Sequence, residues 1–416
     1  MAKTEDKQVT KAEPLAKRMF SALQYRDFRF LWVSQVSAGF SQQAEILARS
    51  WLILQIGGSA TEIGLVHVTR TIGQFAITPV AGVLGDRIDR RMLILAANVV
   101  NVIFFVLLGV LVMTGHIALW HIVASAVIAG AAMTMDQTGR QAAIPALVPK
   151  EGLMNAIALG SVLIGTSRIL GPGLAGIMIK FVGVQGAYFM MAAALILPIV
   201  MVMFMKPIRI RDSKVGESFF TSFKVGLQFV AKNQQVRALM LVQLTCVMFA
   251  MAFQLMMPVY VKQSLGMGAG TLAILAAVPG TLTLFGGFYA ASLGDYKHKG
   301  RLIYISTMSP GIAIIIMGFS DSFVIAILAL LMFGALSSQF MPSNQSAIMK
   351  VVPRELQGRV ASTASLASSM GTVGVIFYGL VSDRWGIDAA FITFGAISCA
   401  LLTLYFIFIK SFRNAA

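Results

Sequence analysis

The sequence has 416 residues, of which 57% are hydrophobic and only 12% are charged. An average soluble domain carries about 25% charged residues, so this composition excludes a soluble globular protein and indicates a polytopic membrane protein. Because one span of the hydrocarbon core needs about 20 apolar residues, the length accommodates up to about twelve spans. The net charge of +16 is explained by the Lys and Arg that collect in cytoplasmic loops, so we expect no nucleic-acid partner.

Two blocks of apolar segments, separated by a polar stretch, follow a polar start. Residues 1–25 contain no apolar run typical of a cleavable signal peptide and predict a cytoplasmic tail. The predicted spans are 30–56, 62–84, 92–114, 118–143, 155–182 and 186–206 in the first block, and 238–262, 269–293, 302–319, 322–343, 360–382 and 387–409 in the second. We therefore predict an all-α membrane protein of twelve transmembrane helices in two six-helix halves, 26–206 and 237–410, with a cytoplasmic tail at 411–416.

The stretch between the halves, 207–236, is predicted to be a cytoplasmic linker. Its apolar residues recur near helical spacing, as Phe219, Phe223, Leu227 and Val230 illustrate. This pattern predicts an amphipathic helix along the inner face of the membrane. A tethered linker without lipid contact is the alternative.

The distribution of Lys and Arg predicts the orientation of the spans. With the N-terminus inside, 26 of the 33 basic residues fall on the cytoplasmic side, whereas Lys180, Lys262 and Arg384 fall outside. Because cytoplasmic loops collect basic residues, this bias predicts a multi-pass protein with both termini in the cytoplasm.

Two segments of the first half recur in the second half in the same order. Residues 141–151 follow the fourth predicted span and residues 345–355 follow the tenth, and six of their eleven positions are identical. The loops that contain Asp86 and Asp295 form the other pair, at an offset of 209 residues against 204. The repeat indicates duplicated halves, and in transporters built this way the substrate path lies between the repeats.

The loop after the second predicted span contains five charged residues within positions 86–91. It resembles the signature loop of the major facilitator superfamily at Gly82, Leu84, Gly85, Asp86, Arg87, Arg90 and Arg91. It departs from the family at Asp89, where a Gly is usual. We expect Gly82 to let two helix ends approach closely.

The resemblance implies that Asp86 and the arginines of this loop close the cytoplasmic side in the outward-facing state. Physically, a carboxylate at a helix end can pair with a basic residue or with a helix N-terminus of the opposite half. The alternative, a simple topology anchor, explains the arginines but not Gly82 and Asp86.

Further motifs resemble one branch of the superfamily. Gly171, Pro172 and Gly176 in the fifth predicted span are similar to the core of the antiporter motif, although Ala175 replaces one Gly. Residues 25–32, 136–149 and 358–362 resemble the transmembrane secretion effectors, which include enterobactin-exporter-like and macrolide-type efflux carriers. This resemblance covers about residues 20–410. It implies a twelve-helix bundle of two pseudo-symmetric halves that works by alternating access around a central cavity.

Charged side chains are predicted within several spans, where an ionisable group is costly and is a functional hypothesis by default. Glu45 and Arg49 are four residues apart on one helical face of the first span. Arg70 of the second span falls at a similar depth. We therefore expect Glu45 to lie within reach of one of these arginines.

Asp136 and Arg140 share a helical face in the same way, and Arg168 falls at a similar depth on the next span. Two interpretations stay open. In one, the four intramembrane arginines belong to a structural ion network that holds the N-terminal half together. In the other, Glu45 and Asp136 bind protons, because burial raises the pKa of a carboxyl and a nearby Arg lowers it.

Polar and methionine side chains within the spans are candidates for the substrate cavity. They are Gln42, Gln137, Gln243, Met251, Gln254 and Gln339. The chain has 25 Met, and soft methionine surfaces adapt to bulky amphipathic ligands. Contact with lipid or with neighbouring helices is the alternative for the methionines.

Missing motifs exclude several classes of function. The sequence has no nucleotide-binding P-loop, no His-Glu-x-x-His zinc motif and no nucleophile elbow. Its four His do not cluster as metal ligands, and its two Cys lie in apolar runs. We therefore expect no enzymatic activity, no cofactor and no bound metal.

The sequence predicts a secondary active transporter, a monomer in the bacterial cytoplasmic membrane. Its partners are protons, a small-molecule substrate and the lipid bilayer. We expect it to couple inward proton flow to export of an amphipathic small molecule, such as a drug or a siderophore-like metabolite. A metabolite symporter or uniporter of the same fold is one alternative. A non-transporting membrane receptor or scaffold is another.

Overall fold

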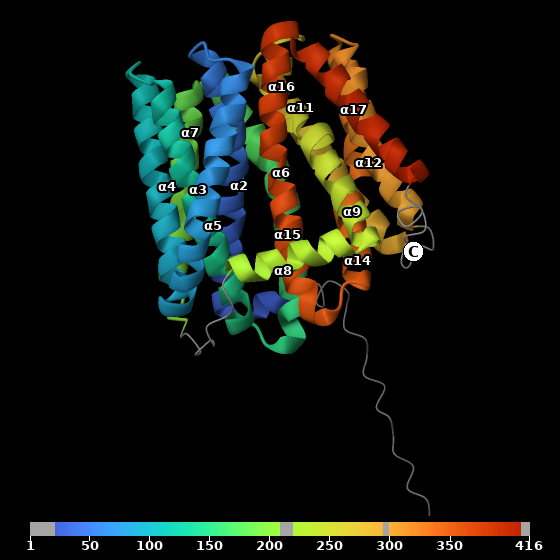
Figure 1. The fold of residues 1–416 in the computed structure, drawn as a ribbon. Helices are drawn as coiled ribbons and strands as arrows, with labels where there is room; N and C mark the ends of the chain where they lie inside the picture. The colour runs from blue at the N-terminus through green and yellow to red at the C-terminus, as the bar shows by residue number, and fades with distance from the viewer. Residues whose placement is uncertain (1–20, 209–218, 294–298, 409–416) are drawn as a thin grey trace, which may run out of the picture.

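The structure, a computed structural model, describes residues 21–208, 219–293 and 299–408. Over these residues it is all-helical, and the first half consists of six long helices, blue to green in Figure 1. They are α2 (Arg26–Gln55), α3 (Ala60–Arg87), α4 (Arg90–Met113), α5 (Leu119–Leu147), α6 (Lys150–Phe181) and α7 (Val184–Met203). Each one coincides with a predicted span to within a few residues, so these six helices are confirmed.

Parts of the predicted tails, linker and loops lie outside the described residues: 1–20, 209–218, the Asp295 loop at 294–298, and 409–416. The described end of the N-terminal tail is ordered. Ser21–Gln24 form a short 3-10 helix. Ala22 is buried there, and its backbone N–H donates to Asn155 Oδ1 of α6 at 3.0 Å.

The second half differs from the first because three of its spans are interrupted helices. Span seven consists of α9 (Gln234–Thr245), a π-helical stretch (Cys246–Met251) and α10 (Phe253–Gln263). Span ten consists of α13 (Phe323–Ser337) and α14 (Phe340–Val351). Span eleven consists of α15 (Gln357–Ser369) and α16 (Gly371–Trp385). The continuous helices are α11 (Ala269–Leu293), α12 (Lys299–Gly318) and α17 (Ile387–Phe408).

The linker helix, α8 (Phe219–Lys232), runs across one end of the bundle beneath α15 in Figure 1. Its Gly226 lies so close to α15 that a Cβ there would meet Thr363 Oγ1 at 2.7 Å. A helix is therefore present where the spacing of apolar residues predicts one. We call this end of the bundle the α8 end, and the opposite end, where α16 finishes, the Asp383 end.

Hydropathy separates the twelve spans into three groups. Across the described residues, eight helical segments are long and apolar enough to cross a bilayer, and 269–282 and 302–318 are apolar but shorter. The two helices left over are α2, which carries five charged residues, and α3, which carries four. They can cross a membrane because Glu45, Arg49 and Arg70 are buried within the protein.

The two halves meet mainly through two helix pairs, α3 with α16 and α6 with α11. The helices approach closely at small residues: a Cβ on Gly379 would meet Ala60 O at 2.7 Å, and one on Gly176 would meet Ala269 O at 2.8 Å. The second helix of each half thus packs on the fifth helix of the other. This reciprocal pairing is the pseudo-symmetry that the repeated segments predict.

The repeated segments have the same structure in both halves, although they lie partly within helices and not wholly after the spans as predicted. α5 continues through Pro145 to Leu147, and α14 continues to Val351. In each case a Val–Pro pair follows, and Val148 and Val352 are extended, with ψ of 134° and 126°. A residue before proline avoids the helical region, so the same dipeptide ends both helices.

A test of the packing inside the first half compares two glycine substitutions. A Cβ on Gly130 of α5 would lie 3.0 Å from the Arg70 carbonyl carbon and 3.2 Å from Gln74 N of α3, whereas one on Gly173 of α6 would meet nothing within 4 Å. Overpacking of this kind costs about 1–3 kcal/mol. We expect Gly130→Ala to lower the melting temperature of the detergent-solubilised protein and Gly173→Ala to leave it unchanged. Equal melting temperatures would show that α3 and α5 are not in tight contact.

Candidate functional site

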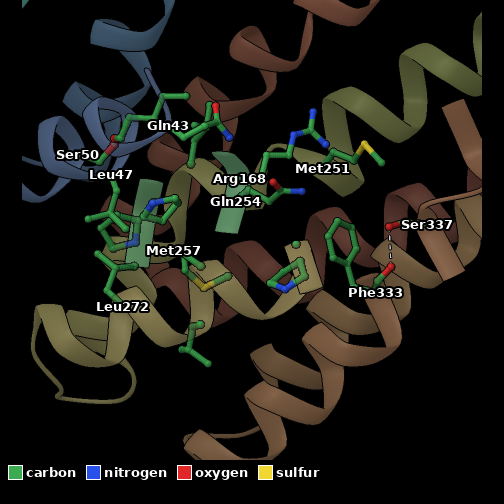
Figure 2. Close-up of a pocket in the computed structure, with 18 of the residues that line it drawn as sticks. Gln43, Leu47, Ser50, Arg168, Met251, Gln254, Met257, Leu272, Phe333 and Ser337 are labelled. Carbon is green, nitrogen blue, oxygen red and sulfur yellow. Dashed lines mark hydrogen bonds between the residues drawn. The ribbon is translucent and has the colours of Figure 1, made fainter. Parts of the chain in front are cut away.

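A cavity of about 450 Å³ lies between the two halves. It is lined from the first half by α2 and α6, and from the second by span seven, α11 and span ten. Figure 2 labels ten of the lining residues: Gln43, Leu47, Ser50, Arg168, Met251, Gln254, Met257, Leu272, Phe333 and Ser337. A concave, mostly apolar site with a few polar groups is the usual form of a small-molecule site.

Two of the helix interruptions border this cavity. The π-helical stretch ends at Met251, and the break between α13 and α14 follows Ser337; both residues line the cavity. π-helical turns frequently occur at functional sites. Interrupted helices at mid-membrane are also typical of the substrate sites of secondary transporters.

Glu45 lies beside the cavity in a buried ion cluster. It is 1% exposed and pairs with Arg49, one turn along α2. Its other oxygen, Oε2, lies 3.3 Å from Arg70 Nη2 of α3. Both contacts considered from the sequence are therefore present, and one carboxylate serves two guanidinium groups.

Ser50, the residue after Arg49, links the cavity to His67 of α3. It lines the cavity, and its hydroxyl lies 3.1 Å from His67 Nε2 on α3. His67 is 3% exposed and lies one helical turn before Arg70. Sequence reasoning did not single out either residue, because a serine and a lone histidine in a span carry no motif.

A second buried cluster contains Asp136. Asp136 Oδ2 accepts from Arg140 Nε at 2.7 Å, and Oδ1 accepts from Asn98 Nδ2 of α4 at 3.0 Å. Arg140 also donates to Ser34 Oγ of α2 at 2.6 Å. These bonds join α2, α4 and α5, so the cluster connects three helices of the first half.

Arg168 does not belong to either cluster, contrary to the expectation of an intramembrane network that includes it. It lines the cavity instead, where Arg168 is solvent-exposed. In the described part of the chain it makes no ion pair. The prediction relied on Arg168 lying at a depth in the membrane similar to that of Asp136 and Arg140. It failed because α6 turns Arg168 toward the other half and away from α5.

The six side chains expected in the cavity divide into two groups. Met251 and Gln254 line it, whereas Gln42, Gln137, Gln243 and Gln339 do not, and the neighbour of Gln42, Gln43, lines it in place of Gln42. The spacing of a helix explains this last error, since adjacent residues point about 100° apart.

Gln243 has a structural role in this conformation. Its amide Nε2 donates to Ala364 O at 2.9 Å and to Ser368 Oγ at 2.8 Å, and its Oε1 accepts from Asn344 at 3.0 Å. These bonds tie α9 to α14 and α15. Gln339 is also buried, at 4% exposed.

The signature loop is held within the first half. Arg90 donates to Ala142 O of α5 at 2.5 Å, and Arg91 donates to Met205 O beyond α7. A Cβ on Gly82 would meet nothing within 4 Å, so the close helix approach expected at Gly82 is absent. Gly85 lies within α3, the side chains of Asp86 and Arg87 are outside what the structure describes, and the gating role of the loop stays a prediction.

Asp89, the departure from the family signature, is the N-cap of α4. Its carboxylate accepts from Arg91 N at 3.1 Å, from Arg91 Nε at 2.9 Å and from Ile208 N at 3.3 Å. Partial burial works to raise its pKa, but the hydrogen bonds from Arg91 and Ile208 outweigh it and lower the pKa of Asp89 below the ordinary 3.8.

The antiporter-like motif places α6 against both halves. A Cβ on Gly171 would lie 2.9 Å from Phe40 O of α2 in the same half, and one on Gly176 would approach Ala269 of α11 in the other. Pro172 lies between them and lines the cavity. The motif therefore lets one helix contact α2, α11 and the cavity within six residues.

The halves are joined at the Asp383 end by a contact that the sequence did not reveal. Asp383 of α16 accepts from the backbone N–H groups of Ala60, at 2.9 Å, and Thr61, at 3.0 Å, in the first turn of α3. A carboxylate is favourable at a helix N-terminus, where N–H groups lack partners. Nearby, Lys262 of α10 donates to Leu54 O of α2 at 2.7 Å.

A family model described as transmembrane secretion effector matches residues 17–414. The chain belongs to this family. Its curated relatives include the multidrug efflux pump Tap of Mycolicibacterium fortuitum, 24% identical over 95% of each chain. The macrolide efflux protein A of Streptococcus pyogenes is 22% identical over 89% of this chain and 93% of its own. The enterobactin exporter EntS of Escherichia coli O1:K1 is 25% identical over 73% and 72%.

Solved structures support the fold. The nucleoside transporter NupG superposes with a TM-score of 0.76 at 11% identity, covering 92% of this chain and 99% of its own. A bacterial homologue of the human lysosomal transporter Spinster gives 0.73 at 12% identity, covering 94% and 98%. The chain is therefore a member of the major facilitator superfamily with its twelve-helix fold, a multi-pass transporter related to efflux proteins.

The Asp383 contact can be tested by measuring the distance between the halves. Thr114 and Asp321 are exposed at the Asp383 end, one in each half. In a chain whose two native cysteines have been replaced, each of these residues is changed to Cys and spin-labelled. Asp383→Ala removes both acceptors, so we expect a larger population of long label distances than in the unsubstituted chain. Arg384→Ala, one position along, is the control. An unchanged distance distribution in Asp383→Ala would show that the cap does not hold this end closed.

The Asp89 cap predicts a pH-dependent stability difference. Loss of an N-cap costs about 0.5–2 kcal/mol, so Asp89→Ala should lower the melting temperature at pH 7. Because the pKa of Asp89 is lowered in the folded state, its contribution is present above the unfolded pKa and is lost as pH falls through the folded value. The difference between the two proteins should therefore shrink in acid. Asp89→Asn keeps a capping oxygen and should show most of the stability without this pH dependence.

Proposed function

We propose that the protein is a proton-coupled antiporter that exports an amphipathic small molecule by alternating access. The observation that carries this proposal is the cavity between the halves, together with the buried Glu45 cluster on the same helix, where Ser50, the residue after Arg49, lines the cavity. The efflux relatives support the direction of transport. The apolar walls and few polar groups of the cavity suit an amphipathic substrate.

The Glu45 cluster has the physical properties that coupling needs. Ionised Glu45 neutralises one positive charge of two, and the whole cluster is buried. A proton on Glu45 removes the partner of both arginines, and the loss of one member of a buried pair costs about 3–5 kcal/mol. Protonation would therefore favour a conformation in which Arg49 and Arg70 find other partners. Asp136, paired with Arg140, is the second candidate.

The same proposal places the α8 end in the cytoplasm of a bacterial cell and the Asp383 end outside. Lys180, Lys262 and Arg384 lie at the Asp383 end, and the basic signature loop lies at the α8 end, in accord with the bias of basic residues toward the cytoplasm. Both termini are then cytoplasmic. The structure would be a state in which the outer side is closed by Asp383.

The coupling proposal is tested by removing the titratable groups. In proteoliposomes with an imposed pH gradient, we expect Glu45→Gln to abolish proton-driven export while the protein stays folded and inserted, because Gln cannot exchange a proton. Asp136→Asn should do the same. Glu45→Asp keeps a carboxyl and should retain part of the coupling.

Glu62→Gln is the matched control. Glu62 lies at the start of α3, where it completes a capping box with Ser59; Gln supports that box as well. The substitution therefore changes the same chemical group outside the cluster and should leave export unaffected. Full pH-dependent transport in both Glu45→Gln and Asp136→Asn would refute the coupling proposal.

The direction of transport is tested separately in cells. When an uncoupler collapses the proton gradient, the amount of a labelled substrate in the cells should rise for an exporter, because outward pumping stops. It should fall for a symporter, because uptake stops. A drop in cell-associated substrate would therefore replace the antiporter proposal with the symporter alternative.

A further inference from the structure

The side chains that line the cavity between the halves carry only positive charge, among the residues that the structure describes. Among the described residues that line it, Arg168 alone carries a formal charge, and no Asp or Glu is present. Glu45 of α2 does not line the cavity and is paired with Arg49 and Arg70. A ligand in the cavity therefore meets a guanidinium group and no carboxylate.

Arg168 is accompanied by neutral hydrogen-bonding groups. Gln43 of α2 and Gln254 of α10 line the same cavity, and Figure 2 shows their amides in the same region as the Arg168 guanidinium. An amide nitrogen donates two hydrogen bonds, and a guanidinium presents five donors in a planar fork that matches a carboxylate. Residues from both halves thus converge on one polar position.

The rest of the cavity is apolar. Met257, Leu272 and Phe333 line it from the second half, and Leu47 lines it from the first. Arg168 makes no ion pair within the described chain, so its charge is available to a ligand. Charge-assisted hydrogen bonds are stronger than neutral ones, particularly where water is excluded. A cationic ligand would be repelled by the same group.

We propose that the cavity takes an amphipathic anion, whose carboxylate or other planar oxyanion lies at Arg168 and whose apolar body lies against the methionine and phenylalanine walls. This inference rests on the proposed export function, since it treats the cavity as the substrate site. It deepens that function by naming the chemical class of the substrate. It also makes Arg168 the residue that selects anionic substrates, with Gln43 and Gln254 as additional hydrogen-bond donors.

The experiment uses three probes that share one apolar body. Pyrene-1-butyrate is an anion, its methyl ester is neutral, and 1-pyrenebutylamine is a cation at pH 7. Binding to the purified full chain in detergent is measured by fluorescence anisotropy. We expect the butyrate to bind about tenfold more tightly than the ester, as one charge-assisted interaction allows, and the amine to bind most weakly. Equal binding of all three, preferential binding of the amine, or no binding of the butyrate would overturn the proposal.

Variants then assign the selectivity to Arg168. Arg168→Gln should lower the affinity for the butyrate about tenfold and leave that for the ester unchanged, whereas a general disturbance of the fold would lower both. Arg168→Lys keeps the charge and should keep part of the preference. Lys180→Gln, which removes a cation from the far end of the same helix, is the control and should change nothing. An equal loss of affinity for butyrate and ester in Arg168→Gln would refute the assignment.

Transport of the same probes in proteoliposomes separates this inference from the proposed function. If the butyrate binds through Arg168 but is never transported, the site has the proposed chemistry and the export function is wrong. If the amine is transported and Arg168→Gln transports it equally well, the protein is a transporter and the anion proposal is wrong.

Discussion

Glu45 shares one carboxylate between Arg49 of its own helix and Arg70 of α3, and much of the first half depends on that contact. An isolated charge in the hydrocarbon core is expensive, so α2 and α3 can span a membrane only if their charges meet inside the protein. The ion pair with Arg70 links α2 to α3, whereas α2 packs mainly on α6 and α7 and presents Gln43, Leu47 and Ser50 to the cavity. The ion pairs that keep these charges out of the lipid therefore lie on the helix that forms one wall of the candidate site.

The two halves share one repeat but differ in their buried polar groups and in the continuity of their helices. The first half holds its helices together with buried polar clusters around Glu45 and Asp136. The second half carries interruptions in spans seven, ten and eleven, two of which border the cavity. An interrupted helix can change its course with less loss of backbone hydrogen bonding than a continuous one. The buried charges therefore lie mainly in the first half, and the interrupted helices in the second.

The pseudo-symmetry also relates the two ends of the bundle. At the Asp383 end, a carboxylate at the last turn of α16 caps the first turn of α3 across the halves. The signature loop puts Asp86 at the last turn of α3, and the symmetry-related partner of that helix end is the start of span eleven. The gating role proposed for Asp86 would then use the chemistry seen at Asp383, with a carboxylate binding the free N–H groups of the opposite helix.

The sequence by itself determined the membrane class, the twelve helices and the duplicated halves, because apolar length and repeated segments are local properties of the chain. It also placed Glu45 within reach of Arg49 and Arg70, since spacing along one helix and depth in the bilayer can be counted. Only the tertiary structure decided that Arg168 leaves the ion network and faces the cavity, that Gln43 takes the place of Gln42, and that Asp383 caps α3. Those facts depend on the rotation of each helix about its axis and on contacts more than 300 residues apart, which packing between the halves fixes and no local pattern records.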